Sequence, residues 1–473
     1  MRLRSGRGLV PPPSPPQGGA RRGGAMRLRS GRRLASPLAP QGGVRRGRRG
    51  SAGGDDRRRA VGEDRISRLP DDILREVLLR LPSPREAARA GVLARRWRGL
   101  WTELGGLTFR GSDLGAVEAA LAQVTRAALN FLDVGMGPDV GMGPDAALTA
   151  GRASSLLRAA ARLAPWALVV SKTPPPLGAP AHDAGDAELP CFARTVSLRL
   201  WLPGLRLTPP SSGEFAALQS LSLHSVRVDL GALLPLCPRL HVLEMEYDDD
   251  VVFGFDTVTI HSASLETLSV HLVDCYVSYI DMDAPMLKVF HLNVDAALDF
   301  GVSFSAPMVE RFYWNCIIQQ KNVGFGEIWR LTSIGEYDQP LSLPGISSSI
   351  LTAHLCIDCV LDIEGDENLP IRTLAQEIAK LPVPKFDALS LALNTYGHVF
   401  GPLVLHLLRI RPSLAFLKVS YTSNLDYEDE EYCSVDCPCK EPYIWGSGSI
   451  QLTDLLEIEF DGFKGEYHEF YLL

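Results

Sequence analysis

An apolar pattern that returns every 22 to 25 residues constrains the fold of this chain more than any other feature. Each copy reads apolar-x-x-apolar-x-apolar. The six clearest copies begin at Ala193, Leu218, Leu240, Leu265, Leu287 and Val309. Because side chains alternate between the two faces of a strand, the second and third apolar residues lie on the core side and the residue between them lies on the open side. The period therefore predicts one short strand per repeat.

Looser copies continue the pattern toward the C-terminus. They begin at Ile350, Phe386, Leu414 and Leu455, and a short helix is expected over 374–381. The array over 193–425 resembles a leucine-rich-repeat solenoid, which implies an α/β repeat architecture. The open-face residues between the core positions are candidates for target binding, and they are Ser222, Glu244, Ser269, His291 and Tyr313.

A second apolar pattern, with helical spacing, occupies residues 64–104. The residues that recur at steps of three and four are Ile66, Leu69, Ile73, Val77 and Leu81. Pro82 ends this helix, and the capping box from Ser83 to Glu86 starts a second one. A third helix is expected from about Leu93. Three helices this short cannot bury all their apolar side chains among themselves, so another chain is expected to cover part of them.

The same segment resembles the F-box, the adaptor-binding module of ubiquitin-ligase substrate receptors. The matching residues are Asp64 to Ser67, Leu69 to Asp71, Ile73-Leu74, Leu81-Pro82, Val92-Leu93, Arg95 to Trp97 and Leu100-Trp101. Arg85-Glu86-Ala87 departs from the pair of Lys and Glu or Asp that is frequent in the family. The resemblance implies a Skp-family adaptor as partner and, through it, a cullin. By motif position, the adaptor-facing or supporting residues are Leu69, Pro70, Ile73, Leu74, Leu78, Val92, Leu93, Trp97 and Trp101.

Residues 433–473 resemble the FBD domain that ends many plant F-box/LRR proteins. The matching residues are Cys433, Cys437, Cys439, Trp445, Leu455 to Ile458, Gly462-Phe463, Gly465 and Glu469-Phe470. Together, the resemblances imply an α+β chain. Its parts are a three-helix F-box, a leucine-rich-repeat solenoid and a C-terminal FBD cap.

The three cysteines of the C-terminal segment raise the question of a zinc site. Zinc needs a fourth ligand, and no cysteine or histidine stands at a standard spacing; His468 is the only later histidine. We therefore predict loop cysteines, with no metal and no other cofactor. Cys356-x-x-Cys359 lies in an apolar, strand-like run, which disfavours a redox site. The sequence has no phosphate loop, metalloprotease motif or nucleophile elbow, so we predict a protein without catalytic residues.

Residues 1–60 differ from the rest of the chain in charge. They hold sixteen Arg, no Lys and two Asp, so their formal charge is +14 and the remaining chain carries −21. Few large apolar residues accompany the arginines, which predicts a disordered tail. Arg clusters at 45–49 and 57–59 are compatible with a nuclear import signal, an RNA contact, or a solvated tail with no specific role. A transit peptide is disfavoured because the tail lacks an amphipathic apolar face.

The stretch 105–190 carries the weakest signal. Segments 114–132 and 155–168 look helical, and the tandem repeat from Gly135 to Asp145 predicts a loop. We expect a helical linker region with loops between the two patterned parts of the chain.

Cysteine usage and hydropathy bear on the compartment. Nine cysteines, an odd number, without a preceding secretory segment favour a reduced intracellular compartment, the nucleus or the cytoplasm. The apolar runs are too short to cross a bilayer, so no membrane association is expected.

These inferences converge on the substrate-recognition subunit of a Skp-cullin-F-box ubiquitin ligase. In this interpretation the repeat and FBD regions capture a target protein. One alternative is an RNA-associated protein that acts through the Arg-rich tail. Another is a scaffold that binds the adaptor without leading a target to degradation. Nucleic acid is not expected to bind outside residues 1–60, because the remaining chain is acidic.

Overall fold

The structure is a computed structural model of the 473-residue chain. It describes residues 2–5, 69–81, 84–93, 95–111, 113–137, 148–173, 185–247, 255–318, 323–325, 328–340, 349–359, 372–382, 385–422, 433, 437, 439 and 450–463. The predicted disordered tail at 1–60 lies outside the described residues except at 2–5. These four residues form strand β1 (Arg2–Ser5), which pairs in parallel with β19 (Glu457–Phe463) and which the sequence did not predict.

Short helices come first after β1 in the described part of the chain. They are α1 (Asp71–Leu79), α2 (Pro84–Leu93) and the 3₁₀ turns η1 (Arg95–Trp97) and η2 (Leu100–Glu103). Proline suits the first position of α2, where an amide would have no partner in the helix. The sequence predicted one continuous third helix from Leu93. The structure instead places Gly99 in a left-handed conformation, with φ at 81°, which separates the two 3₁₀ turns.

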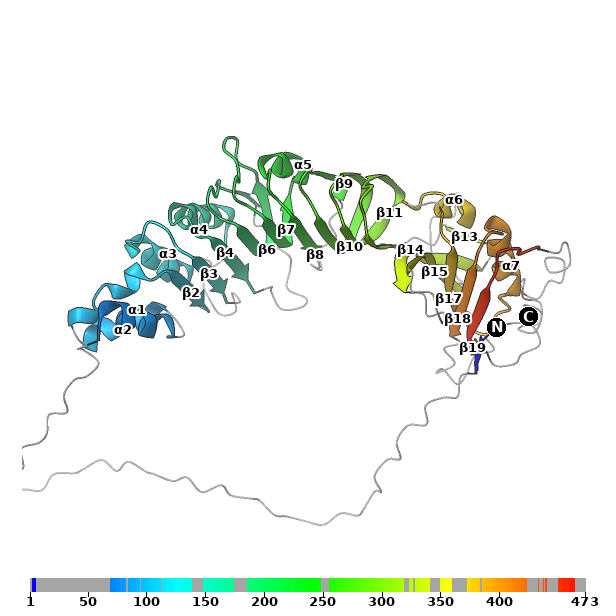
Figure 1. Ribbon diagram of the computed structural model, residues 1–473, viewed down its shortest axis with the longest axis horizontal. Helices are drawn as coiled ribbons and strands as arrows, with labels where there is room; N and C mark the ends of the chain where they lie inside the picture. Colours follow the sequence, from blue (N-terminus) through cyan, green and yellow to red (C-terminus); the bar gives the residue numbers. More distant parts are fainter. Residues whose placement is uncertain are drawn as a thin grey trace, which may run out of the picture. The chain divides into compact units, whose positions relative to one another are not determined.

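The linker region contributes the first strands of the sheet. Strands β2 (Gly106–Arg110), β3 (Phe131–Met136) and β4 (Ala167–Lys172) pair in parallel and are connected by helices α3 (Leu114–Gln123) and α4 (Ala150–Arg162). Figure 1 shows both helices on the same side of these strands. The Asp113 carboxylate starts α3 by accepting a hydrogen bond from the Ala116 amide at 3.1 Å. The helices predicted over 114–132 and 155–168 were therefore wrong at their C-terminal ends, where β3 and β4 stand.

A run of parallel strands confirms the predicted repeat register. The strands are β6 (Ser197–Thr208), β7 (Ser220–Val228), β8 (Val242–Tyr247), β10 (Thr267–Asp283), β11 (Val289–Ser305) and β12 (Arg311–Ile317). The core residues that pair across them are Leu221, Leu243, Leu268, Phe290 and Phe312. The first copy was assigned wrongly, because Leu198 and not Val196 pairs with Leu221.

Shorter elements lie beside this run. Strands β5 (Gly185–Glu188) and β9 (Phe255–His261) pair in parallel with the C-terminal halves of β6 and β10. Helix α5 (Leu230–Leu233) and the turn η4 (Leu234–Leu236) connect β7 to β8. The Asp229 carboxylate caps α5 by accepting from the Ala232 amide at 3.2 Å.

The parallel order is interrupted after β12. Strand β14 (Trp329–Pro340), which the sequence did not predict, runs antiparallel to β12, to β13 (Val323–Phe325) and to β15 (Ser349–Cys359). Parallel pairing resumes from β15 through β17 (Ala388–Asn394) and β18 (Phe416–Thr422) to β19. The predicted core residues of these later copies pair as expected: Leu355, Leu391, Val419 and Phe460.

Two helices accompany the last strands. Helix α6 (Leu374–Ile378) follows β16 (Arg372–Thr373), and α7 (Gly401–Ile410) connects β17 to β18. Thr373 and Gln376 form a capping box that starts α6. The short helix expected over 374–381 is therefore confirmed, although it ends at Ile378 and continues only as a turn.

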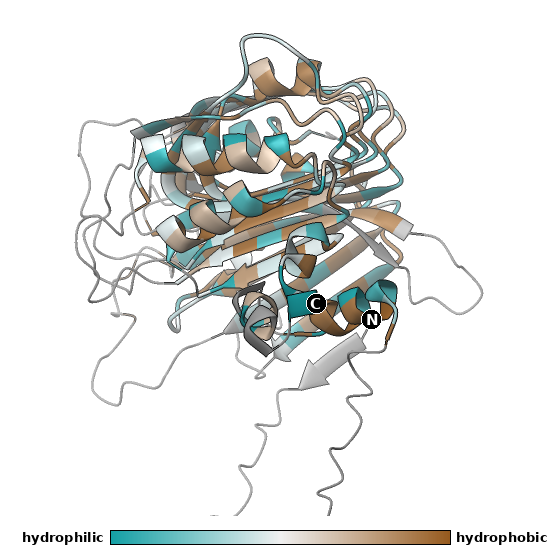
Figure 2. Ribbon diagram, turned by 90° about the vertical axis from the view of Figure 1, so that its left-hand side faces the viewer, coloured by the Kyte–Doolittle hydropathy of each residue, from teal (hydrophilic) through white to brown (hydrophobic). Residues whose placement is uncertain are grey.

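The core follows the inward face of the strands. Leu243, Leu268 and Leu391 are completely buried, and Leu221 and Phe460 are nearly so. Figure 2 shows hydrophobic segments in brown along the stacked strands. Among the described residues, no helix is both long and apolar enough to cross a membrane. The described chain is thus a strand-rich α+β fold with a long parallel sheet, compatible with leucine-rich repeats.

Gly335 lies where the antiparallel strand β14 approaches β12 closely enough to exclude a side chain. A Cβ at this position would lie 2.5 Å from the Trp314 carbonyl oxygen on β12. We expect Gly335→Ala to lower the free energy of unfolding by about 1–3 kcal/mol, because the strands must move apart. A matched control is Gly151→Ala in α4, where a Cβ meets nothing within 4 Å. That control should raise stability by roughly 0.5 kcal/mol. Thermal melts of both variants measure the difference, and equal melting would contradict the pairing of β14 with β12.

Candidate functional site

Helix α1 carries an apolar face that the described chain leaves open. Ile73 is 46% exposed and Val77 is 41% exposed, and their spacing of four residues places them on one side of the helix. Pro70, also exposed, lies just before the first turn. Leu74 and Leu78 fix the other side of the helix in the core. We call Pro70, Ile73 and Val77 the α1 apolar face.

The predicted adaptor residues fall into three groups. Pro70 and Ile73 are exposed and Leu69 is half-buried. The buried residues, which support the fold, are Leu74, Leu78, Trp97 and Trp101. The side chains of Val92 and Leu93 lie outside the described part. Val77 was part of the predicted helical stripe but not of the adaptor set, and its exposure adds it to the open face.

Ion pairs hold α1 against the turns that follow. Arg96 Nη2 in η1 lies 2.7 Å from Asp71 Oδ1, and Arg75 Nη2 lies 2.7 Å from Glu103 Oε2 in η2. These groups are partly exposed, so each pair contributes little to stability. The two pairs connect α1 with η1 and η2.

The five predicted target-binding residues form one row across neighbouring strands. Ser222, Glu244, Ser269, His291 and Tyr313 occupy equivalent register positions on β7, β8, β10, β11 and β12. The pairing confirms that they share one face of the sheet. Their exposure differs, because Glu244 and His291 are exposed while Ser222 is only 3% exposed. The buried Ser222 side chain contacts a neighbour instead of solvent: its Oγ lies 2.8 Å from His224 Nε2.

A second row, two residues further along each strand, was missed by the sequence reasoning. It consists of Trp201, His224, Glu246, His271, Asn293 and Asn315. The same alternation that predicted the first row would have found it. We call the two sets of residues the first row and the second row.

Hydrogen bonds link the second row from strand to strand. His224 Nδ1 lies 2.9 Å from Glu246 Oε2. Asn293 Nδ2 lies 3.2 Å from His271 Nδ1, and Asn315 Nδ2 donates to Asn293 Oδ1 at 2.8 Å. Side chains held in this way present a fixed polar pattern to a binding partner.

The first row adds aromatic surface beside these polar groups. The rings of His291 and Tyr313 lie 4.4 Å apart between centroids. Partial burial, and then the nearby His271, lower the pKa of His291, so its imidazole is neutral at neutral pH. The two rows therefore offer hydrogen-bonding groups and aromatic rings on one face of the sheet.

Relatives that are named for their domains align with most of this chain's sequence. One F-box/FBD/LRR-repeat protein of Arabidopsis thaliana is 27% identical over 346 residues, which cover 67% of this chain and 72% of the relative. Another from the same plant is 24% identical over 387 residues, or 78% of this chain and 86% of the relative. Over most of its length, the chain is similar to F-box/FBD/LRR-repeat proteins.

A shorter similarity agrees with these two. The F-box/LRR-repeat protein 13 of Arabidopsis thaliana is 47% identical over 58 residues, only 12% of this chain and 13% of the relative. No protein-family model matches the chain. No solved structure matches it either.

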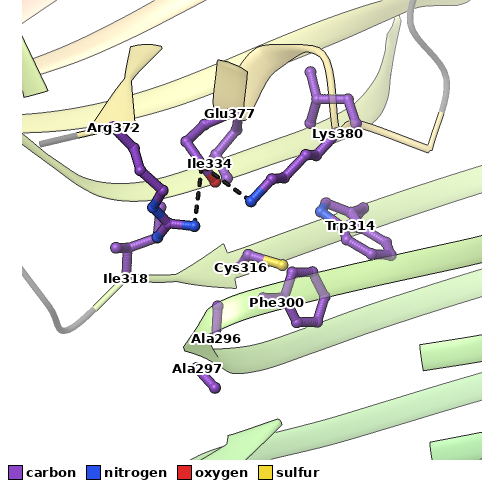
Figure 3. Close-up of a pocket in the computed structure, with 11 residues that line it drawn as sticks. Ala296, Ala297, Phe300, Trp314, Cys316, Ile318, Ile334, Arg372, Glu377 and Lys380 are labelled. Carbon is purple, nitrogen blue, oxygen red and sulfur yellow. Dashed lines mark ion pairs between the residues drawn. The ribbon is translucent and has the colours of Figure 1, made fainter. Parts of the chain in front are cut away.

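One small cavity lies where the parallel order of the strands is interrupted. Figure 3 shows Glu377 of α6 between Arg372 and Lys380, with Trp314 and Cys316 of β12 nearby. Glu377 Oε1 lies 3.2 Å from Arg372 Nη1 and 3.1 Å from Lys380 Nζ. The cavity volume is about 20 Å³, enough for a water molecule and too small for an organic ligand. The polar trio therefore serves to pack α6.

The predicted loop cysteines of the FBD segment lie beside a histidine that the spacing argument did not consider. Ligand atoms of His398, Cys433, Cys437 and Cys439 all lie within 4.8 Å of one another. His398 precedes Cys437 by 39 residues, and the fold brings it to the cysteines. A search for a fourth ligand at short spacing cannot find such a residue. Burial raises the pKa of the Cys439 thiol, and a backbone hydrogen bond from Val399 opposes that shift.

Proposed function

We propose that this chain is a substrate receptor of a Skp-cullin-F-box ubiquitin ligase. The proposal rests on the α1 apolar face, because it leaves apolar side chains open within the segment that resembles an F-box. A Skp-family adaptor that covers this face would connect the chain to a cullin and its RING subunit. We further propose that residues 64–104 form the F-box, 105–425 the linker and repeat array, and 433–473 the FBD domain.

In this role the chain carries out no bond chemistry. It would hold a target beside the ubiquitin-charged enzyme that the cullin recruits. Transfer to a target lysine then proceeds at a high effective concentration, as if within one molecule. The relatives are named for an F-box, an FBD domain and LRR repeats, which supports this role.

The first and second rows are the proposed surface for the target. They offer hydrogen-bonding groups on successive strands and aromatic rings at Trp201 and Tyr313. Glu244 and Glu246 add negative charge to a chain that is already acidic outside its tail. Such a surface favours a target segment that carries Lys or Arg. The nucleus and the cytoplasm are the proposed locations.

The test compares the full chain with a chain that lacks residues 64–104. Both are expressed with an affinity tag in plant cells, with the proteasome inhibited, and purified. We expect adaptor and cullin to copurify with the full chain alone. Proteins bound through the rows should copurify with both chains. Equal recovery of adaptor by the two chains would contradict the proposal.

A double variant on the first row separates target binding from adaptor binding. We expect His291→Ala with Tyr313→Ala to weaken capture of the proteins bound through the rows by about tenfold or more, since the variant removes two neighbouring rings, tilted against each other, from an interface. Adaptor recovery should not change, because the row lies on β11 and β12 and not on α1. Quantitative mass spectrometry of the purified material measures both. The matched control is Asp256→Ala on β9, an exposed residue outside both rows.

A further inference from the structure

Three cysteines and a histidine converge near the end of the sheet. Cys433 Sγ lies 3.4 Å from Cys439 Sγ, and Cys437 Sγ lies 3.3 Å from His398 Nδ1. None of these three cysteines is joined to another in a disulfide. His398 is 1% exposed, Cys437 6% and Cys439 7%. A set of soft donors is thus enclosed by protein.

These separations match the size of a zinc ion. Sulfur at about 2.3 Å and nitrogen at about 2.0 Å from a tetrahedral ion lie roughly 3.5–3.8 Å from one another. The Cys433–Cys439 and Cys437–His398 separations agree with this spacing within a few tenths of an ångström, and all four ligand atoms lie within 4.8 Å of one another. Three thiolates and one imidazole are a frequent structural zinc set, and soft sulfur donors disfavour magnesium and calcium.

The backbone around the four ligands is arranged to hold them. The His398 amide donates to the Thr395 carbonyl at 2.8 Å, which closes a tight turn directly after β17. Tyr396 and Gly397 take left-handed conformations in this turn, with φ at 43° and 78°. The next residue, Val399, donates its amide hydrogen to Cys439 Sγ. Bonds of this kind orient thiolate ligands in metal sites.

We propose that His398, Cys433, Cys437 and Cys439 bind one structural Zn²⁺ ion. The ion ties the C-terminal cysteine segment to the connection between β17 and α7. Four protein ligands leave no open position, so the ion stabilises the fold and takes no part in a reaction. The site explains why three cysteines stand at 433, 437 and 439 next to a buried histidine. It departs from the sequence prediction of loop cysteines and does not depend on the proposed adaptor binding.

The test measures zinc in the full chain after expression with added zinc and purification under reducing conditions. We expect about one zinc per chain by elemental mass spectrometry. Cys439→Ala and His398→Ala should each weaken zinc binding by roughly a hundredfold or more, since ligand loss exceeds the effect of losing an outer partner. The matched control is Cys237→Ala. Cys237 is buried at the end of η4 and lies outside the cluster, so this variant should bind as much zinc as the wild-type chain.

If the alanine variants do not fold, replacing the histidine ligand with a cysteine provides a second test. His398→Cys should retain zinc, and its cobalt-substituted form should show stronger thiolate-to-cobalt absorption than the wild-type form. A chelator should lower the melting temperature of the wild-type chain. Absence of zinc from the folded wild-type chain would overturn the proposal, as would a Cys433–Cys439 disulfide or full zinc content in folded Cys439→Ala. These outcomes leave adaptor binding, and with it the proposed function, unaffected.

Discussion

Replacing Ile73 and Val77 together with Ser is expected to weaken binding of a Skp-family adaptor by on the order of a hundredfold. Both side chains are exposed on one side of α1, at 46% and 41%. Burying an aliphatic side chain contributes about 1.5–3 kcal/mol. Two such anchors that contribute about 3 kcal/mol together correspond to roughly a hundredfold in affinity. Calorimetry with the purified adaptor measures the change.

The control for this experiment is another exposed apolar residue. Trp166, 51% exposed, precedes β4, and Trp166→Ser should leave adaptor affinity unchanged. The melting temperature of the double variant should match that of the wild-type chain, because neither residue is in the core. Binding at wild-type strength would rule out the α1 apolar face as the adaptor surface. Changing Leu69 and Pro70 is a less clean test, since Leu69 packs partly against the core.

Leu268→Asp is expected to prevent folding of the repeat strands. Leu268 is completely buried on β10 and pairs with Leu243 on β8 and Phe290 on β11. A carboxylate there would lose its hydration without gaining a partner, at a cost of at least about 4–5 kcal/mol. That is a large share of the 5–15 kcal/mol typical of folded proteins. Soluble yield and thermal melting measure the effect.

The neighbouring residue provides the matched control. Ser269 lies on the open face of the same strand and is half-exposed. Ser269→Asp introduces the same charge one position away and should change stability by less than about 1 kcal/mol. If the two variants melt alike, the assignment of core and open faces to β10 is wrong.

The repeat register could be predicted because alternation and period reinforce each other. Leu268 and Phe290 were placed correctly from sequence spacing, and the strands pair them. The reversal at β14 could not be predicted, because alternating side chains look the same in parallel and antiparallel strands. Strand β3 was missed because a short apolar run fits a buried strand and a helix equally well.

The candidate sites likewise combine features that the sequence predicts with features that only the packed structure determines. The first row follows from alternation alone, whereas the burial of Ser222 depends on how the side chains around it pack. Exposure of Val77 depends on how α1 packs, which a helical stripe does not determine. His398 and the cysteines are brought together by contacts between distant segments, and sequence spacing carries no record of such contacts.

The nearly constant step between parallel repeat strands has a consequence for how the array grows. Val242 pairs with Thr267, Thr267 with Val289 and Val289 with Arg311, so each added strand closes a loop of similar length. The entropy lost in closing a loop depends on that length and not on the number of strands already stacked. Insertion of one whole repeat by gene duplication therefore extends the binding surface at an unchanged cost per strand, which makes reach a property that evolution can alter separately from stability.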